Sequence, residues 1–407
     1  MTSLRRAWLA FLVLGCSESG QVLGPAPTAA PTPTDTTEPP PEPTTLAASQ
    51  VTTGVSHSCA LALGSIYCWG SNEFGQVGNG ATADALGPEL VTGTERYQNL
   101  CAGNEHTCGL TDLGEVFCWG NNQRGQLGQG DRRALSRAAR VSLPGNATQV
   151  TCGFAHTCAL LGNAEAWCWG QNGEGELGLD DPYPGNTPEN ADVLEPVRVG
   201  DATYRSIGPG DGHTCLVRSD GALFCTGRNK QHQLGSASDQ IQERLLLRVG
   251  SDSDWVQVVS GQQYSCALRS DRTLWCWGSN TAIQSDEGSP LGIPAEESIT
   301  PSRVPGGDWL SAVAHTFHTC AIARDANVWC WGRNAEGQLN SGDVALRVGP
   351  VEIGRRATSL DVGLFTTCLV DGAGIVSCAG KNDNGELGTG DRERRYTLTD
   401  VPLAVPE

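Results

Sequence analysis

Histidine, cysteine and tryptophan gather in one short stretch, Gly103 to Gly128, which reads GNEHTCGLTDLGEVFCWGNNQRGQLG. His106 and Cys108 are two residues apart, so on a strand both side chains would lie on one face. With Cys118 they could supply three ligands to a metal ion. The same two cysteines could instead form a disulfide across a hairpin, because residues 112–114 (Asp-Leu-Gly) form a turn signal between two short runs.

This stretch recurs seven times, and the first cysteines of successive copies are 48 to 57 residues apart. Each copy contains at least one hairpin, and a unit of that size cannot bury a core alone, so it must stack against its neighbours. The period suits a four-stranded propeller blade, and no segment shows helical periodicity. The sequence therefore predicts an all-β, seven-bladed β-propeller.

The repeated pattern is G-x-x-H-[TS]-C-[AG]-L followed by [FYW]-C-W-G-x-N-x-x-G-Q-L-G. It resembles the repeat of the RCC1 (regulator of chromosome condensation) family, and the resemblance covers about Leu46 to Glu407. The resemblance implies the same seven-bladed propeller. Members of that family include nucleotide-exchange factors, ubiquitin-ligase modules, a light sensor and a secreted β-lactamase inhibitor, so the fold alone leaves the function open.

Most of the seventeen cysteines fall into pairs around the hairpin turns. In an exported protein such pairs predict disulfides, although the metal alternative stays open until thiols are titrated. Cys101 and Cys152 occupy equivalent positions on neighbouring repeats, which predicts a bridge between two blades if their Cα atoms lie within about 7 Å. The predicted hairpin pairs are Cys59–Cys68, Cys108–Cys118, Cys158–Cys168, Cys215–Cys225, Cys266–Cys276, Cys320–Cys330 and Cys368–Cys378.

Other repeated residues favour a structural role. A histidine holds one slot in five copies, and a tryptophan follows the second cysteine in five, which favours hydrogen bonding and packing between blades. The glycines form neither a dinucleotide-binding nor a Walker motif, and no hydrolase or kinase signature occurs. We therefore expect no cofactor, no metal and no catalytic residue. The histidines are His57, His106, His156, His213 and His318, and the tryptophans are Trp69, Trp119, Trp169, Trp277 and Trp331.

The N-terminus predicts export. Arg5 and Arg6 precede a short apolar run, and Gly15 stands just before Cys16, a pattern that resembles a bacterial lipobox. We expect residues 1–15 to be a signal peptide and Cys16 to carry a lipid. Residues 16–45 are rich in proline and threonine and predict an extended tether, followed by the propeller at 46–407. The expected location is the outer membrane or cell surface, with a periplasm-facing position as the alternative.

The ends of the repeat array predict how the ring closes. The first repeat begins at Leu46 without the P-x-x-V segment that precedes other repeats, such as Pro301 to Val304. A similar segment follows the last repeat at Thr399 to Leu403. The C-terminal strand is therefore expected to pair with the first blade, which would remove an open sheet edge.

The formal charge of −18, with only two lysines, argues against nucleic acid as a partner. We expect a monomer that binds an unknown protein, because propeller loops on one rim commonly form binding surfaces. An enzyme that uses the central channel, a hydrolase or lyase, is one alternative, and nucleotide exchange, implied by the family resemblance alone, is another. Two acidic insertions depart from the repeat and are the predicted partner-binding loops, through Asp180, Asp181, Tyr183, Asn186, Glu189, Asp192, Ser285, Asp286 and Glu287.

Overall fold

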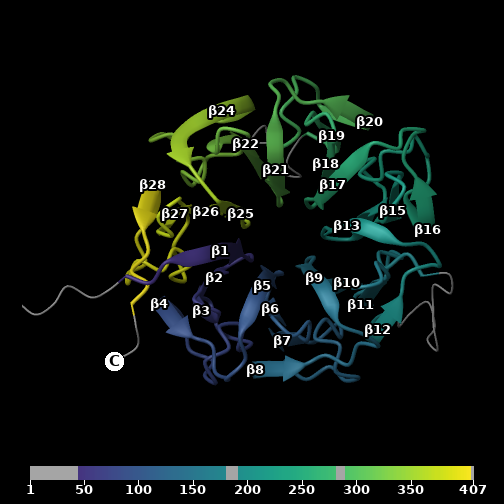
Figure 1. The fold of residues 1–407 in the computed structure, drawn as a ribbon. Coiled ribbons are helices and arrows are strands. Elements are labelled where there is room, and N and C mark those ends of the chain that lie inside the picture. The colour runs from purple at the N-terminus through teal and green to yellow at the C-terminus, as the bar shows by residue number, and fades with distance from the viewer. Residues whose placement is uncertain (1–44, 180–190, 281–288, 405–407) are drawn as a thin grey trace, which may run out of the picture. The chain divides into compact units, whose positions relative to one another are not determined.

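The computed structural model describes residues 45–179, 191–280 and 289–404, which form seven four-stranded sheets arranged around a central axis (Figure 1). In each sheet the four strands are consecutive along the chain, so every blade is one continuous stretch. The described residues contain no helix, and hence none that could span a membrane. The predicted all-β, seven-bladed propeller is confirmed. The predicted signal peptide, Cys16 and all of the predicted tether except Thr45 lie outside the described residues.

The strands fall into four classes by their place in the blade. The innermost strands are β1 (Ala48–Thr53), β5 (Tyr97–Ala102), β9 (Ala147–Cys152), β13 (Tyr204–Pro209), β17 (Trp255–Ser260), β21 (Trp309–Ala314) and β25 (Ser359–Val362). The second strands are β2 (His57–Ala62), β6 (His106–Thr111), β10 (His156–Leu161), β14 (His213–Arg218), β18 (Tyr264–Arg269), β22 (His318–Ala323) and β26 (Thr366–Val370).

The third strands are β3 (Ser65–Gly70), β7 (Val116–Gly120), β11 (Ala166–Gly170), β15 (Leu223–Arg228), β19 (Leu274–Ser279), β23 (Asn327–Gly332) and β27 (Val376–Gly380). The outermost strands are β4 (Ala85–Leu90), β8 (Leu135–Arg140), β12 (Val193–Arg198), β16 (Gln242–Arg248), β20 (Glu297–Arg303), β24 (Arg347–Arg356) and β28 (Arg395–Asp400). Blade 1 comprises β1 to β4, and the following blades are numbered in chain order.

The repeated tryptophans join each blade to the one before it. All five are fully buried, and the Nε1 of Trp119 donates a hydrogen bond of 2.9 Å to the carbonyl of Gln76 in the preceding blade. In the next blade, the indole ring of Trp169 packs closely on Gly128, whose φ is +68°. A Cβ atom added to Gly128 would lie 2.9 Å from Trp169 Nε1. Trp69, Trp169, Trp277 and Trp331 donate equivalent bonds to carbonyls of their preceding blades.

The repeated histidines form a belt of hydrogen bonds that runs from blade to blade. His106 Nε2 lies 2.9 Å from Thr157 Oγ1, whose own hydroxyl is 2.9 Å from the carbonyl of Gln126. That hydroxyl has one proton to donate, which the carbonyl accepts, so His106 must donate from Nε2 and leave Nδ1 unprotonated. The same contact joins His57, His156, His213 and His318 to the next blade, and Tyr264 replaces the histidine in blade 5 through a 2.8 Å bond to Thr319.

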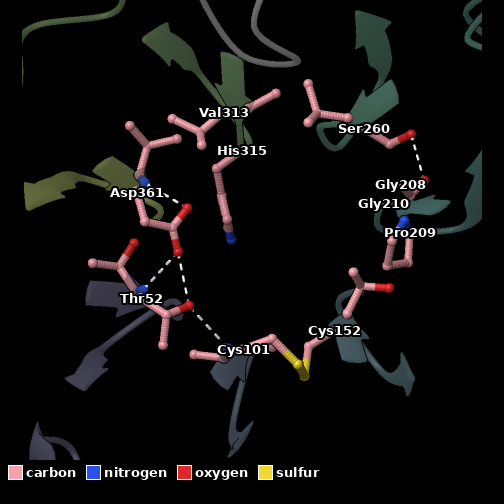
Figure 2. A pocket seen from close by; sticks show the side chains of 18 of the residues that line it. Thr52, Cys101, Cys152, Gly208, Pro209, Gly210, Ser260, Val313, His315 and Asp361 are labelled. Atoms are coloured by element: carbon pink, nitrogen blue, oxygen red, sulfur yellow. Dashed lines mark hydrogen bonds between the residues drawn. A yellow bond between two sulfur atoms is a disulfide. The ribbon is translucent and has the colours of Figure 1, made fainter. Parts of the chain in front are cut away.

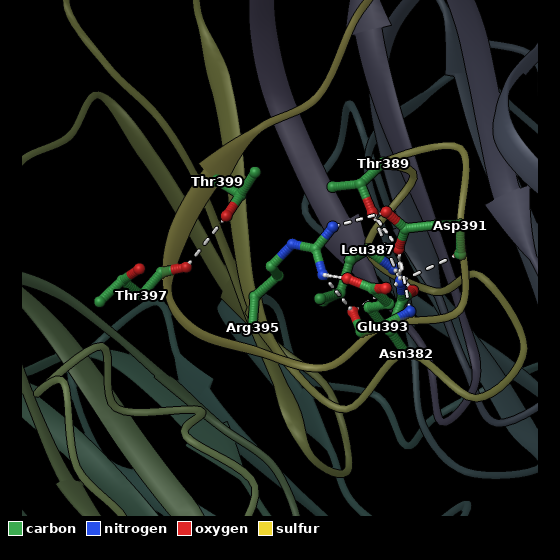
Figure 3. Close-up of polar contacts among 8 residues, drawn as sticks. All are labelled: Asn382, Leu387, Thr389, Asp391, Glu393, Arg395, Thr397 and Thr399. Carbon is green, nitrogen blue, oxygen red and sulfur yellow. Dashed lines mark hydrogen bonds and ion pairs between the residues drawn. The ribbon is translucent and has the colours of Figure 1, made fainter. Parts of the chain in front are cut away.

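An asparagine closes the loop after each third strand. In blade 7 the Oδ1 of Asn382 accepts a hydrogen bond from Leu387 N at 2.9 Å, while its Nδ2 donates to the carbonyls of Asp391 and Glu393 (Figure 3). In blade 5 the insertion lies inside this loop, and Asn280 Oδ1 still accepts from Leu291 N at 2.9 Å. Leu291 and the glycine after it therefore keep the repeat's Leu-Gly turn.

The predicted closure by the C-terminal strand is wrong. β28 pairs with β27 as the outermost strand of blade 7, and blade 1 is completed by its own β4. Each P-x-x-V segment belongs to the outermost strand of the blade before it. The prediction instead assigned the segment to the start of the following repeat, and therefore set each boundary one strand too early. The two ends of the propeller nevertheless meet, through a 2.9 Å bond from Leu46 N to Leu403 O and an isolated bridge between Thr45 and Ala404.

Candidate functional site at the channel mouth

The structure joins the sixteen propeller cysteines in the eight pairs that the sequence predicted. The fourteen hairpin cysteines are fully buried, whereas Cys101 and Cys152 are half-buried and line the central channel (Figure 2). Their Cα atoms are 5.5 Å apart, which satisfies the distance condition for the bridge between blades 2 and 3. Within the described ranges, the one cluster of three metal-ligating side chains is Cys101, Cys108 and Cys152, and all three sulfurs are already bonded.

We expect a mild phosphine reductant to open the Cys101–Cys152 bridge first, because a reductant must reach the sulfur and the hairpin sulfurs are buried. Mass spectrometry after alkylation of the folded protein should find two modified cysteines, both from this pair. A Cys101→Ser/Cys152→Ser variant is the matched control and should yield none under the same conditions. Equal modification of the hairpin cysteines in folded protein would contradict this assignment.

The channel holds a cavity of about 330 Å³ between the innermost strands. His315 points into it from blade 6, and Asp361 faces it from blade 7 (Figure 2). Burial lowers the pKa of His315 to about 4 and raises the pKa of Asp361 to about 6. A neutral imidazole and a carboxyl group are groups that acid–base catalysis uses.

Contacts with the neighbouring blade occupy the Asp361 carboxylate. Its Oδ2 accepts bonds of 2.8 Å from Thr52 Oγ1 and 2.9 Å from Thr53 N, and Oδ1 accepts from Val362 N (Figure 2). Among the described residues no hydrogen bond or ion pair joins Asp361 to His315. Asp361 therefore fastens blade 7 to blade 1, and these two groups do not form a catalytic pair in this structure.

An aromatic and cationic patch lies beside the channel mouth, on the turns that follow the innermost and the third strands of blades 6 and 7. The rings of Phe317 and Phe365 stack with centroids 5.5 Å apart and an interplanar angle of 17°. The guanidinium of Arg333 lies 5.2 and 5.1 Å from the two centroids, and the ammonium of Lys381 lies 5.9 Å from that of Phe365. All four side chains are half-buried, and we call them the mouth patch.

The repeat positions these four residues. Each phenylalanine takes the second variable place of G-x-x-H, and each cation follows the glycine that ends the third strand. The turn is tied to the strand end by bonds from Arg333 N to Phe317 O and from Lys381 N to Phe365 O. Neighbouring blades therefore place two aromatic rings and two cations side by side on a rigid frame.

Blade 4 has a cation at the same repeat position, and two carboxylates pair with it. Arg228 Nη1 lies 3.2 Å from Asp211 Oδ2, and its Nε lies 3.4 Å from Glu174 Oε1. In the mouth patch Lys381 pairs with Asp383 at 3.2 Å, whereas Arg333 lies over both phenyl rings. The sequence analysis missed this patch, although the sequence carries a signal for it: Phe and then Arg or Lys recur at the same two places in two successive repeats.

The predicted partner-binding loops lie mostly outside the described residues, which include neither Asp180, Asp181, Tyr183, Asn186 and Glu189 nor Ser285, Asp286 and Glu287. Asp192 is described, and it is buried against the preceding blade. Its side chain is 8% exposed, and its Oδ2 lies 2.7 Å from Arg132 Nη1 and 3.6 Å from Arg124 Nη1 of the preceding blade. Asp192 therefore belongs to a contact between blades 2 and 3.

Comparison with known families agrees with this architecture. A model of the RCC1-like domain matches residues 10–291, which is more than half of the chain, and a model of the regulator of chromosome condensation (RCC1) repeat matches residues 316–338. The chain belongs to the RCC1-like domain family. The later repeat match falls on β22 and β23, so the family pattern extends into blade 6.

Among curated relatives, this RCC1-like chain is 26% identical over 304 residues to the ultraviolet-B receptor UVR8 of Arabidopsis thaliana, covering 72% of the chain and 55% of the receptor. It is 28% identical over 138 residues to the human E3 ubiquitin-protein ligase HERC2, covering 33% of the chain and 3% of the ligase. The chain thus spans about half or less of the length of these relatives.

Two solved structures show the same fold. One is yeast RCC1 (Prp20) bound by Kap60, with a TM-score of 0.71, 20% identity and coverage of 83% of each chain. The other is human WBSCR16, with a TM-score of 0.67, 20% identity and coverage of 77% of this chain and 84% of that one. Identities this low establish a shared propeller and leave the partner of this chain open.

Proposed function

We propose that this RCC1-like propeller is an exported, lipid-anchored protein-binding module of the bacterial cell envelope and that it has no catalytic activity of its own. The observation that carries the proposal is the mouth patch, because half-exposed aromatic rings with an arginine are the groups that dominate binding energy in protein interfaces. Residues 16–45 would tether the propeller to a lipid on Cys16.

The chemistry of the patch indicates the kind of surface that it would contact. Phe317 and Phe365 offer an apolar platform, and the guanidinium of Arg333 and the ammonium of Lys381 lie against these rings. An apolar side chain flanked by a carboxylate on the partner would complement both features. The disulfide in each blade would keep the platform rigid, so little entropy would be lost on binding.

The two alternatives have less support. A channel enzyme could draw on Asp361 and His315, both within the described ranges, but Asp361 is engaged with blade 1 and forms no bond with His315. Nucleotide exchange has only the family resemblance behind it. Prp20p of Saccharomyces cerevisiae shares the propeller fold and binds Gsp1p and histones, but an identity of 19% transfers neither partner to this chain.

Truncating the patch tests the proposal. We expect Arg333→Ala to weaken partner binding about 10- to 100-fold, because hot-spot residues typically contribute about 1–3 kcal/mol. Arg228→Ala is a matched control, since Arg228 occupies the same repeat position in blade 4, away from the stacked rings of Phe317 and Phe365. Affinity is measured by surface plasmon resonance against envelope protein retained by the wild-type propeller. Equal affinity for wild type and Arg333→Ala would refute the assignment of the patch.

A further inference from the structure

A second cavity lies on blade 6 at the opposite end of β21 from the channel mouth. Its volume is about 630 Å³, and its lining includes Trp309, Trp329, Asp308, Ala323 and Arg324. The two tryptophan rings meet edge to face, with centroids 6.1 Å apart and an interplanar angle of 86°. The cavity is thus an aromatic corner with a carboxylate beside it.

Blade 5 contains the same corner, but there an arginine fills it. Trp255 and Trp275 meet with centroids 6.5 Å apart at 86°. The Arg269 guanidinium lies 4.5 Å from the Trp255 centroid and 4.4 Å from the Trp275 centroid. The same guanidinium forms ion pairs with Asp252 and, at 3.8 Å from its Nε, with Asp254 Oδ1. Blade 5 therefore shows which ligand this corner accommodates.

The strand register makes the two blades directly comparable. Arg269 is paired with Trp255 in blade 5, and Ala323 is paired with Trp309 at the same place in blade 6. An aspartate precedes the inner tryptophan in both blades, as Asp254 and as Asp308. Blade 6 thus keeps the tryptophans and the carboxylate, while alanine replaces the cation that would occupy the space between them.

We propose that the blade 6 cavity binds a guanidinium group, supplied by an arginine side chain of a partner or by a free guanidine compound. The ligand would take the place that Arg269 holds in blade 5, against the half-buried Trp329 and the part of the buried Trp309 that lines the cavity, near the Asp308 carboxylate. The electron-rich faces of tryptophan rings attract a cation of this kind. The cavity is larger than one guanidinium needs, so the ligand can carry further atoms.

Two arginines already form ion pairs with Asp308, and they reduce what its carboxylate can contribute to ligand binding. Arg272 Nη1 is 3.0 Å from Asp308 Oδ1, and Arg324 Nη1 is 3.9 Å from Oδ2. The Arg324 side chain is 68% exposed and the Asp308 side chain 53%, so solvent screens their charges. The tryptophan faces, rather than the carboxylate, therefore provide most of the recognition.

The test titrates the full chain with N-acetyl-arginine-N-methylamide and follows tryptophan fluorescence, with the citrulline analogue as a neutral probe of the same shape. We expect saturable quenching by the arginine compound and at least a tenfold weaker response to citrulline. Agmatine, a free guanidine compound, forms a second arm. Binding of agmatine as tightly as the amide indicates recognition of the guanidinium alone, and weaker binding indicates an arginine within a peptide chain.

Two variants give opposite expectations. Ala323→Arg restores the blade 5 arrangement, so the site should be occupied by its own side chain and binding should be lost. Arg269→Ala removes the side chain that fills the corner in blade 5. The number of arginine compounds bound per chain should then rise from one to two. Binding by Ala323→Arg equal to wild type, or equal responses to arginine and citrulline compounds, would overturn the proposal. Because this cavity and the mouth patch lie at opposite ends of β21, the outcome leaves the proposed function of the patch untouched.

Discussion

Lowering the pH from 7 to about 4.5 should unfold the propeller. Burial lowers the pKa of His57 and His156 to about 4 and of His106, His213 and His318 to about 3, while the same side chains in the unfolded chain titrate near 6.5. Each belt histidine therefore contributes stability that is present above pH 6.5 and is lost as the pH falls toward its folded value. The loss is about 1.4 kcal/mol per pH unit for each histidine.

Five histidines that lose stability together should exceed a typical net stability of roughly 5–15 kcal/mol within a few pH units. Glu176 and Asp361 act in the opposite direction, because burial raises their pKa to about 7 and about 6, so they lose stability as the pH rises. Burial also raises the pKa of Asp211 and of Glu386, so four carboxyl groups act in this direction. Burial lowers the pKa of His315 to about 4, so six histidines act in the other direction, and acid sensitivity should dominate.

Urea unfolding followed by circular dichroism at pH 7, 6, 5 and 4.5 measures this effect. His106→Tyr is the matched variant, since Tyr264 already makes the belt contact in blade 5 through a 2.8 Å bond to Thr319. That variant should take up about one proton fewer on unfolding. A free energy of unfolding that stays constant between pH 7 and 4.5 would show that the histidines do not remain neutral in the folded state.

Trp169→Ala should reduce the free energy of unfolding by about 3–5 kcal/mol, the range for removing a buried aromatic side chain. The substitution opens a cavity between blades 2 and 3 and removes the hydrogen bond from Nε1 to Gln126 O. The space between blades is filled by pairing a tryptophan with a glycine of the preceding loop, and Gly128 is the partner of Trp169.

The chain itself suggests the second half of this test. In blade 7 the tryptophan is replaced by Ala379, and the loop glycine before it is replaced by Asn340, which keeps a φ of 54° and accepts a bond from Leu398 N at 2.6 Å. Gly128→Asn should therefore destabilise the wild type but cost much less in Trp169→Ala. A double-mutant cycle should give a coupling of about 1–3 kcal/mol, and additive effects would contradict this pairing.

The fold was predictable because the repeat carries its own constraints. The spacing of Cys108 and Cys118 placed a hairpin in each unit, and the period then left room for two further strands. The bridge between Cys101 and Cys152 followed from their equivalent positions once the units were taken as blades. Ring closure was mispredicted because a cyclic repeat has no intrinsic start, so Thr399 to Leu403 could be assigned to either neighbouring blade.

The candidate sites were harder to predict because they depend on which blades are neighbours and on small departures within the repeat. The two insertions were predicted to bind a partner because they depart from the length of the repeat. Asp192, in the first of them, is a buried partner in an ion pair between blades. Phe317 and Phe365 form a site only because adjacent blades bring their rings together. Ala323 is informative only when it is compared with Arg269, which holds the same position in blade 5. An alanine alone does not indicate that a larger side chain is absent.

The proposed role of the mouth patch is tested most directly by site-specific photo-crosslinking in envelope extracts. A photoreactive phenylalanine analogue replaces Phe317 in one protein and Leu113, which is 70% exposed and follows the far end of β6, in the control. We expect one discrete adduct from position 317, abolished by excess unlabelled wild type but not by excess Arg333→Ala, and no such adduct from position 113. Adducts that form equally at both positions, or that Arg333→Ala competes away as well as wild type does, would contradict the proposal that this propeller binds its partner through the mouth patch.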